Sequence, residues 1–170
     1  MKNVLVVIDM QNDFIDGALG TEEAQEILPR VAERINSFEG DIYFTRDTHG
    51  ENYLESAEGR KLPVPYCIKD SGGWQISSAL DTSRAKAIID KPTFGSTELA
   101  ELLAQRGDEI SSITLTGVCT DICVISNAML IKARLPEIPL AVDASCCAGV
   151  TPESHENALA AMKMCQIEIL

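Results

Sequence analysis

The sequence has few basic residues and no long apolar run. It contains 14 lysines and arginines against 26 aspartates and glutamates, a formal net charge of −12. Binding to a phosphate backbone or to an anionic membrane needs clustered cationic side chains, so we expect neither kind of partner. The first apolar run, residues 4–8, covers only five residues before Asp9, which is too short for a signal peptide or a membrane span. We therefore expect a cytoplasmic protein.

The cysteines also lack the spacing of a structural site. No Cys-x-x-Cys pair occurs among the six cysteines, so a zinc ribbon or a thioredoxin-type redox site has no support. In a reducing compartment we expect all of these thiols to be free. With 170 residues, 45% of them hydrophobic, the chain can bury a full core without disulfides. We expect a single domain over residues 1–170.

The sequence does contain an alternation of short apolar runs and helical patterns. Strands are expected over residues 3–8, 41–45, 85–90, 113–115, 139–142 and 166–170. Helices are expected to begin at Thr21, at Ser96 or Thr97, at Thr120 or Asp121, and at Thr151. Residues 50–83 show no periodicity and are expected to form a long functional loop. This order predicts an α/β fold, a three-layer α/β/α sandwich around a central, mostly parallel six-stranded sheet.

One stretch, Gly117-Val118-Cys119-Thr120-Asp121-Ile122-Cys123, lies between an expected strand and a helical pattern. Passage into a helix through Thr or Asp predicts an N-cap, which would place Cys123 in the first helical turn. There, unpaired N–H groups and the helix dipole would lower the pKa of the thiol and could bind an oxyanion. Cys123 is therefore a candidate nucleophile, although a buried structural cysteine would explain the same pattern.

Two other expected strands end in reactive side chains. Asp9 follows the first strand, and Lys91 follows the third. The carboxyl ends of parallel strands meet at one edge of the sheet, where ligands bind. Together with Cys123 these residues would provide a nucleophile, a carboxylate that accepts its proton, and a cation that lowers the pKa of both. Taken singly, Asp9 could cap a loop and Lys91 could be a solvated surface residue.

The segment Asp9-Met10-Gln11-Asn12-Asp13-Phe14, together with Lys91 and the stretch that ends at Cys123, resembles the isochorismatase-like cysteine hydrolases in order and spacing. That superfamily includes nicotinamidase/pyrazinamidase-type amidases, N-carbamoylsarcosine amidase and isochorismatase. The resemblance covers essentially the whole chain and is closest to the nicotinamidase type. It implies that Cys123 attacks an amide carbonyl to form a thioester, that Asp9 acts as acid and base, and that Lys91 gives electrostatic support.

The resemblance further implies a cis Val118–Cys119 peptide bond, with the N–H groups of Cys119 and Cys123 forming an oxyanion hole. The thiol of Cys119 occupies a position that is commonly a small residue in the family, so we expect it to be incidental. Replacing Cys119 should therefore matter much less than replacing Cys123.

The resemblance also implies a divalent metal ion. Asp47 and His49 leave an expected strand end on one face, and nicotinamidases bind metal through such a pair plus a later His that precedes a Cys. Here Tyr66 precedes Cys67, and a phenol is a poor zinc ligand near neutral pH. Glu58 is the candidate substitute. A site of Asp47, His49 and Glu58 would hold Zn, Mn, Fe or Mg or be empty, while the alternative is a His49 that only hydrogen-bonds within a loop.

The expected partner is a small neutral amide, with nicotinamide the leading candidate and no organic cofactor. The resemblance puts the ring of Phe14 against an aromatic substrate, and Tyr66 and Trp74 are candidates for the same pocket, although core packing would explain any of the three. Alternatives are an N-carbamoyl or isochorismate-type substrate, or a catalytically silent binding member. By analogy alone, we expect a homo-oligomer. His155 is expected to lie on the surface of the last helix.

Overall fold

The computed structural model describes residues 1–170 and contains a six-stranded sheet in the order β3-β2-β1-β4-β5-β6. All neighbouring strands are parallel. The strands are β1 (Lys2–Ile8), β2 (Asp41–Asp47), β3 (Ala85–Lys91), β4 (Ile110–Val118), β5 (Leu140–Ala148) and β6 (Glu168–Ile169). The α-helices are α1 (Asn12–Ile15), α2 (Glu22–Ser37), α3 (Ala57–Lys61), α4 (Thr97–Ala104), α5 (Ile125–Arg134) and α6 (Pro152–Met164). The predicted α/β fold is confirmed, with a sheet that is parallel throughout.

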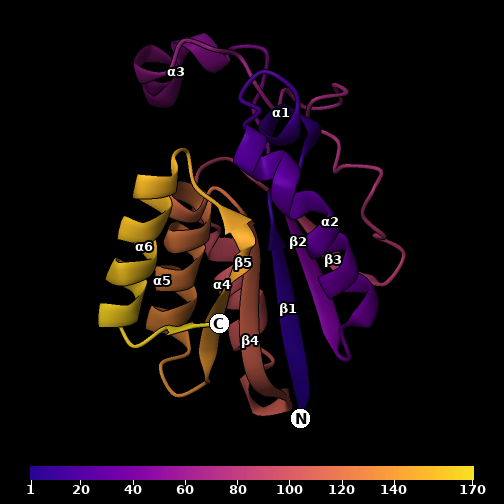
Figure 1. Ribbon diagram of the computed structural model, residues 1–170, viewed down its shortest axis with the longest axis vertical. Coiled ribbons are helices and arrows are strands. Elements are labelled where there is room, and N and C mark those ends of the chain that lie inside the picture. Colours follow the sequence, from indigo (N-terminus) through magenta and orange to yellow (C-terminus); the bar gives the residue numbers. More distant parts are fainter.

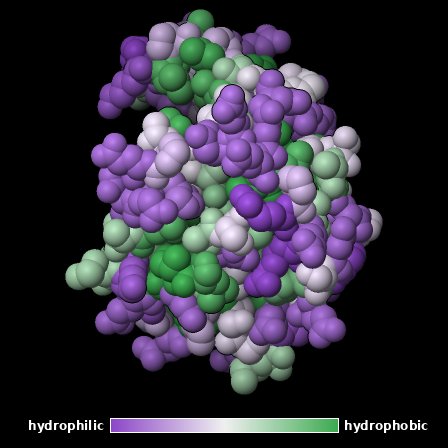
Figure 2. Space-filling model, in the orientation of Figure 1, coloured by the Kyte–Doolittle hydropathy of each residue, from purple (hydrophilic) through white to green (hydrophobic).

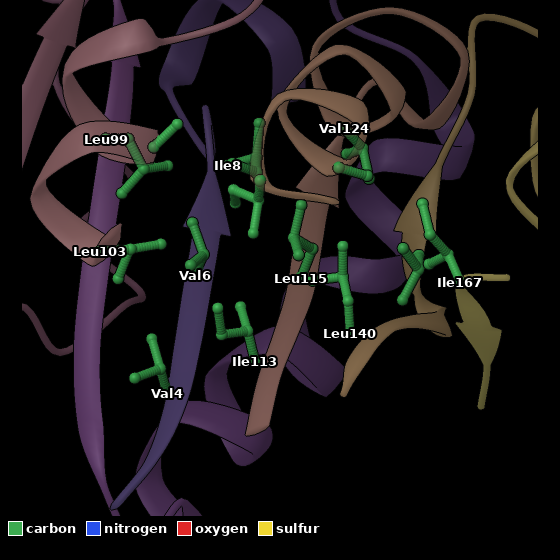
Figure 3. Close-up of a cluster of buried hydrophobic side chains, with 14 of the residues drawn as sticks. Val4, Val6, Ile8, Leu99, Leu103, Ile113, Leu115, Val124, Leu140 and Ile167 are labelled. Carbon is green, nitrogen blue, oxygen red and sulfur yellow. The ribbon is translucent and has the colours of Figure 1, made fainter. Parts of the chain in front are cut away.

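Helices cover both faces of the sheet (Figure 1). The side chains of β1 alternate between two buried clusters, because successive residues of a strand point to opposite faces. Val4, Val6 and Ile8 belong to the cluster that includes α4, α5 and α6, part of which is drawn in Figure 3. Leu5 and Val7 belong to the other cluster, with α1 and α2. The unbroken apolar run of this strand is therefore what burial on both faces requires.

Three helices begin where their capping residues predict. The side-chain oxygens of Thr21, Ser96 and Thr151 each accept a backbone N–H from the first turn of α2, α4 and α6. These bonds satisfy donors that would otherwise have no partner at the helix start. None of the helices combines the length and the apolar character needed to cross a bilayer.

Several boundaries differ from the sequence predictions. Strand β5 continues to Ala148 instead of ending at Asp143, because its last residues pair with the end of β4. Strand β6 is shorter than residues 166–170. The segment 50–83 is not a bare loop, since it contains the 3-10 turn η1 (Tyr53–Glu55) and helix α3. In Figure 1 the part of this segment that contains α3 lies beyond the carboxyl ends of the strands, above the sheet, and the chain then descends along the right side to the start of β3.

Gly117 lies near the end of β4, opposite Ile8 of β1. Its φ is +112°, and a Cβ atom there would lie 2.1 Å from the carbonyl oxygen of Ile8. Only a residue without a side chain allows this approach. Because Gly117 comes just before the Val118–Cys119 segment, this contact also fixes where the chain leaves the sheet.

We expect Gly117→Ala to lower the free energy of unfolding by more than about 3 kcal/mol, since it adds backbone strain to a backbone clash. The matched control is Gly72→Ala, because nothing lies within 4 Å of a Cβ at Gly72, and its effect should stay within about 0.5 kcal/mol. Thermal and urea unfolding followed by circular dichroism measure both changes. Equal stability of the two variants would contradict the close packing of β4 on β1.

Candidate active site

Asp9, Lys91 and Cys123 meet at the carboxyl edge of the sheet. Lys91 Nζ lies 2.6 Å from Asp9 Oδ2 and 3.5 Å from Cys123 Sγ. A carboxylate oxygen of Asp9, one of Asp47 and the sulfur of Cys123 all lie within 4.8 Å of one another. The exposed fractions of Asp9, Lys91 and Cys123 are only 0%, 1% and 3%. The structure thus brings together the three residues that the sequence singled out for catalysis.

Each charged member of this group is also held by a neighbour. The hydroxyl of Thr45 donates to Asp9 Oδ1 at 2.7 Å, and the Asp9 N–H donates to the carbonyl of Thr45 at 3.2 Å. Lys91 Nζ donates to the carbonyl of Thr93 at 3.1 Å. Because Asp9 and Lys91 are bonded to backbone or buried groups, neither can turn away without losing several bonds.

Burial and mutual charge shift the pKa values of all three groups. Burial raises the pKa of the Asp9 carboxyl, against the effect of the Lys91 ammonium. Burial also raises the pKa of the Cys123 thiol, and the negative charge of Asp9 raises it further. Burial alone would lower the pKa of Lys91, but the facing Asp9 raises it above its ordinary value. The 2.6 Å contact of Lys91 with Asp9 has the geometry of an ion pair, and the raised pKa of Cys123 favours a neutral thiol beside it.

The turn that carries Cys123 differs from its prediction. Residues Thr120–Val124 form a π-helical turn, and the α-helix begins only afterwards. Thr120 and Asp121 do not cap that helix, because the Thr120 hydroxyl is bonded to His155 and Asp121 Oδ1 accepts the Val150 N–H at 3.1 Å. The expectation that a helix start lowers the pKa of Cys123 is wrong, since burial and Asp9 raise it.

The backbone just before this turn has the predicted conformation. The Val118–Cys119 peptide bond is cis. The N–H of Cys119 donates to no acceptor within the chain. Cys119 and Cys123 both line the same cavity, so an unpaired donor is available beside the sulfur.

A cavity of about 620 Å³ opens beside Cys123. Phe14 and Tyr66 line it, as predicted for the pocket, but Trp74 does not. Trp74 instead lies under the Arg46 guanidinium, 3.7 Å from the ring centre, and donates its indole N–H to Thr48. The surface in Figure 2 is indented at the upper left, between α3 and the connection from β5 to α6, the elements that supply opposite walls.

A second polar group adjoins the first. Asp47 Oδ1 lies 3.4 Å from His49 Nε2, which lies 3.8 Å from Glu58 Oε1. Asp47 Oδ1 and His49 Nε2 are buried and have no hydrogen-bond partner. The hydroxyl of Tyr66 donates to Glu58 and lies 3.3 Å from Asp47 Oδ2. The phenol of Tyr66 therefore lies against this group and is bonded to one of its carboxylates.

These three residues fit one divalent cation. Ligands bound at about 2.0–2.2 Å from a metal stand roughly 3–3.6 Å apart, close to the separations in this group. A bound ion would also satisfy the two buried atoms that have no partner, which otherwise carry a desolvation cost. With two carboxylates and one imidazole, the donor set does not select strongly among Zn, Mn, Fe and Mg.

The sequence matches the isochorismatase domain family over residues 3–170. The chain belongs to the isochorismatase family. The zinc complex of Pyrococcus horikoshii pyrazinamidase is similar, with a TM-score of 0.84 and 30% identity over 100% of this chain and 99% of that one. Bacillus subtilis nicotinamidase/pyrazinamidase gives a TM-score of 0.85 at 27% identity over 99% of each chain. The Mycobacterium tuberculosis nicotinamidase/pyrazinamidase is 25% identical over 186 residues, which cover 98% of this chain and 97% of that one.

These comparisons confirm the resemblance to the isochorismatase-like family and to nicotinamidase-type relatives. As an isochorismatase-family member with such relatives along its full length, the chain is a hydrolase that acts on C–N amide bonds. Fold alone would not carry this conclusion. The combination of the family match and the amidase relatives does.

Within this isochorismatase-family site, other residues have roles that the sequence did not indicate. Gln11 is fully buried, and its side chain donates to the Asp47 carbonyl at 2.8 Å and accepts the Asp47 N–H at 2.7 Å. Asp13 Oδ2 accepts the N–H of Cys67 at 2.7 Å. The segment that begins at Asp9 therefore positions the second polar group as well as the first.

His155 lies on the last helix, as expected, but it is not a free surface residue. It is half-buried, and its Nδ1 lies 2.7 Å from the Thr120 hydroxyl. A surface assignment was natural because nothing along the sequence links α6 to the turn that carries Cys123.

Asp9→Asn tests the electrostatics of this site. The change removes the candidate base, so amide hydrolysis should fall by roughly 10²–10⁴-fold. It also removes the carboxylate that raises the pKa of Cys123 while Lys91 stays in place, so that pKa should fall. Alkylation of Cys123 by iodoacetamide is measured by mass spectrometry across pH. Near neutral pH it should be faster in Asp9→Asn than in the wild type, although hydrolysis is lost. Exposed Cys165 is the internal control and should be unchanged, and slower alkylation of Cys123 would contradict this electrostatic picture.

Proposed function

We propose that this protein is a cysteine amidase that hydrolyses a small neutral amide, with nicotinamide as the leading candidate substrate. The observation that carries the proposal is the buried group of Asp9, Lys91 and Cys123, in which the lysine nitrogen lies 2.6 Å from the carboxylate and 3.5 Å from the sulfur. Relatives named nicotinamidase or pyrazinamidase support the substrate class. Because all three of these side chains are present and lie close together, the alternative of a catalytically silent family member is disfavoured.

In the first half of the reaction, Asp9 accepts the thiol proton as the sulfur of Cys123 attacks the amide carbonyl carbon. The negative charge that develops on the carbonyl oxygen is met by the N–H groups of Cys119 and Cys123. Lys91 remains protonated and stabilises the anionic groups around it. Asp9 then gives the proton to the leaving nitrogen, so that a primary amide releases ammonia and leaves a thioester on Cys123.

In the second half, a water molecule attacks the thioester carbonyl while Asp9 accepts a proton from it. Collapse of the tetrahedral intermediate breaks the carbon–sulfur bond, and the proton returns to the sulfur. The product is a carboxylic acid, and the enzyme is restored to its resting state. Asp9 thus performs both acid and base steps, as a carboxylate with a raised pKa can near neutral pH.

The walls of the cavity favour a neutral substrate with a flat apolar body. The rings of Phe14 and Tyr66 lie 5.4 Å apart between their centres and offer apolar faces to a substrate ring. Among the residues that line the cavity, only Lys61 is cationic, so the walls offer few positive contacts to a substrate that carries two carboxylates. The scarcity of such contacts argues for an amide such as nicotinamide over an isochorismate-type substrate.

We further propose that Asp47, His49 and Glu58 hold one divalent cation. When bound, such an ion supplies a Lewis acid that polarises or orients a polar atom of the substrate or a water molecule. The hydrogen bond from Tyr66 would orient Glu58 toward the ion, as groups behind a metal ligand commonly do. The single-domain organisation, the homo-oligomeric state and the cytoplasmic location expected from the sequence stay predictions.

The first test measures ammonia release from nicotinamide with two matched cysteine variants. Cys123→Ala should abolish turnover, because no other thiol is held against Asp9 and Lys91. Cys119→Ala should keep most of it, because the N–H of residue 119 belongs to the backbone and survives the substitution. The opposite outcome would assign the nucleophile to Cys119, and a wild-type protein that hydrolyses no amide in a panel of primary amides would refute the proposed activity.

A second test concerns the metal. His49→Ala should remove bound metal, measured by elemental analysis of protein purified without chelators. Tyr66→His should tighten zinc binding in competition with a chromophoric chelator, because imidazole is a better zinc ligand than phenol. Tyr66→Phe, which cannot bind metal, is the control and should bind zinc no more tightly than wild type. The site would be ruled out if the wild-type protein is purified without metal and if Tyr66→His does not change its zinc affinity.

A further inference from the structure

Asn127 is a buried polar residue that the reaction does not use. It lies in the first turn of α5 with an exposed fraction of 0%, next to the fully buried Ala128. Asparagine is a poor helix former, and a buried amide is costly unless its hydrogen bonds are made. An apolar residue would serve the packing of this helix better, so the amide needs another explanation.

The Asn127 side chain joins two segments of the site. Its Nδ2 donates to the carbonyl of Cys123 at 2.8 Å and to the carbonyl of Phe94 at 3.1 Å. Its Oδ1 accepts the N–H of Ser96 at 2.9 Å. Both donors and the acceptor of one rigid, planar group are therefore used. One end of this connection is the backbone of the candidate nucleophile, and the other is the chain between β3 and α4.

That connection between β3 and α4 starts at Lys91. Its Thr93 carbonyl accepts a hydrogen bond from Lys91 Nζ, and Thr93 and Phe94 line the cavity. The connection also packs closely on α5, because a Cβ atom at Gly95 would lie 2.7 Å from the Leu130 side chain. A larger residue at that position would have to displace the end of the Leu130 side chain.

We propose that Asn127 is a positioning residue that sets the placement of Cys123 relative to Lys91. Its amide fixes the Cys123 backbone on one side and the segment that holds Lys91 on the other, and so maintains the 3.5 Å separation of Nζ and Sγ. Misplacing a catalytic group by about 1 Å can cost on the order of 100-fold in rate. The proposal rests on the function proposed above for Cys123 and Lys91.

The rival role is purely structural. Asn127 accepts the Ser96 N–H, and Ser96 begins α4, so the amide could serve only to anchor that helix. Ser96 already caps α4 through its own hydroxyl, which accepts the Leu99 N–H at 3.0 Å. The two roles differ in which bond matters, the one to Ser96 or the ones to the carbonyls of Cys123 and Phe94.

Two substitutions separate these roles. Asn127→Ala removes all of the bonds. Asn127→Ser removes the bonds to Phe94 and Ser96 but can still donate its hydroxyl to the carbonyl four residues back in a helix, that of Cys123. We expect Asn127→Ala to lower kcat for amide hydrolysis by roughly 10–100-fold with a smaller change in KM, and Asn127→Ser to recover part of that loss. Asn157→Ala, at an exposed position of α6, is the control and should leave kcat unchanged.

Alkylation gives a readout that needs no substrate. The iodoacetamide rate constant of Cys123, relative to exposed Cys165 in the same sample, should fall severalfold in Asn127→Ala and less in Asn127→Ser. In a Lys91→Met background, Asn127→Ala should change the alkylation rate constant of Cys123 little further, because the effects of substitutions in residues that act as one unit do not add. All rates are compared on protein shown to be folded by circular dichroism at the assay temperature.

The outcomes are distinct. If Asn127→Ala and Asn127→Ser impair the enzyme equally, or if Asn127→Ala leaves the alkylation rate of Cys123 unchanged, the positioning role is overturned. An additive effect with Lys91→Met would overturn it as well. If the wild type hydrolyses no amide but the alkylation results hold, the proposed substrate class fails while the role of Asn127 stands.

Discussion

The site depends on a buried ion pair between two strands that are not neighbours. Lys91 closes β3 and Asp9 follows β1, and β2 lies between them in the sheet. Their 2.6 Å contact therefore spans the end of β2, where the Thr45 hydroxyl donates to the same carboxylate. Removing one partner of a buried pair leaves an uncompensated charge and typically costs about 3–5 kcal/mol. The ends of these strands must consequently stay in register. The sulfur of Cys123 then lies beside an ion pair whose position is already fixed by the sheet.

Asp47 connects this pair to the second polar group. Its Oδ1 lies 3.8 Å from Lys91 Nζ and 3.4 Å from His49 Nε2. The carboxylate therefore belongs to both groups, and any cation held beside His49 would reduce the negative charge that faces Lys91. Gln11 binds the backbone N–H and carbonyl of Asp47, which explains why a single segment after β1 serves both halves of the site.

Sequence reasoning located the parts of the site that follow from regular geometry. Asp9 and Lys91 come at the ends of parallel strands, and parallel strands deliver their ends to one edge whatever else the chain does. The caps at Thr21, Ser96 and Thr151 depend on local chemistry alone and were predictable for the same reason. The conformation of residues 120–124 could not be predicted in this way, because the side chains of Thr120 and Asp121 bond to His155 and Val150 on a segment distant in the sequence. Trp74 was misplaced because residues 50–83 offer no periodicity from which the direction of a side chain can be read.

The segment 50–83 forms one wall of the cavity but supplies none of the three side chains of the Asp9, Lys91 and Cys123 group. Asp9, Lys91 and Cys123 come from strand ends and one tight turn, whereas Glu58, Leu62 and Tyr66 on the opposite wall of the cavity all come from this one excursion of the chain. Insertions and replacements there can alter what fits in the cavity without disturbing a single bond of the ion pair. The group of Asp9, Lys91 and Cys123 and the shape of the cavity can therefore vary independently, so that the same three side chains can serve cavities of different shape.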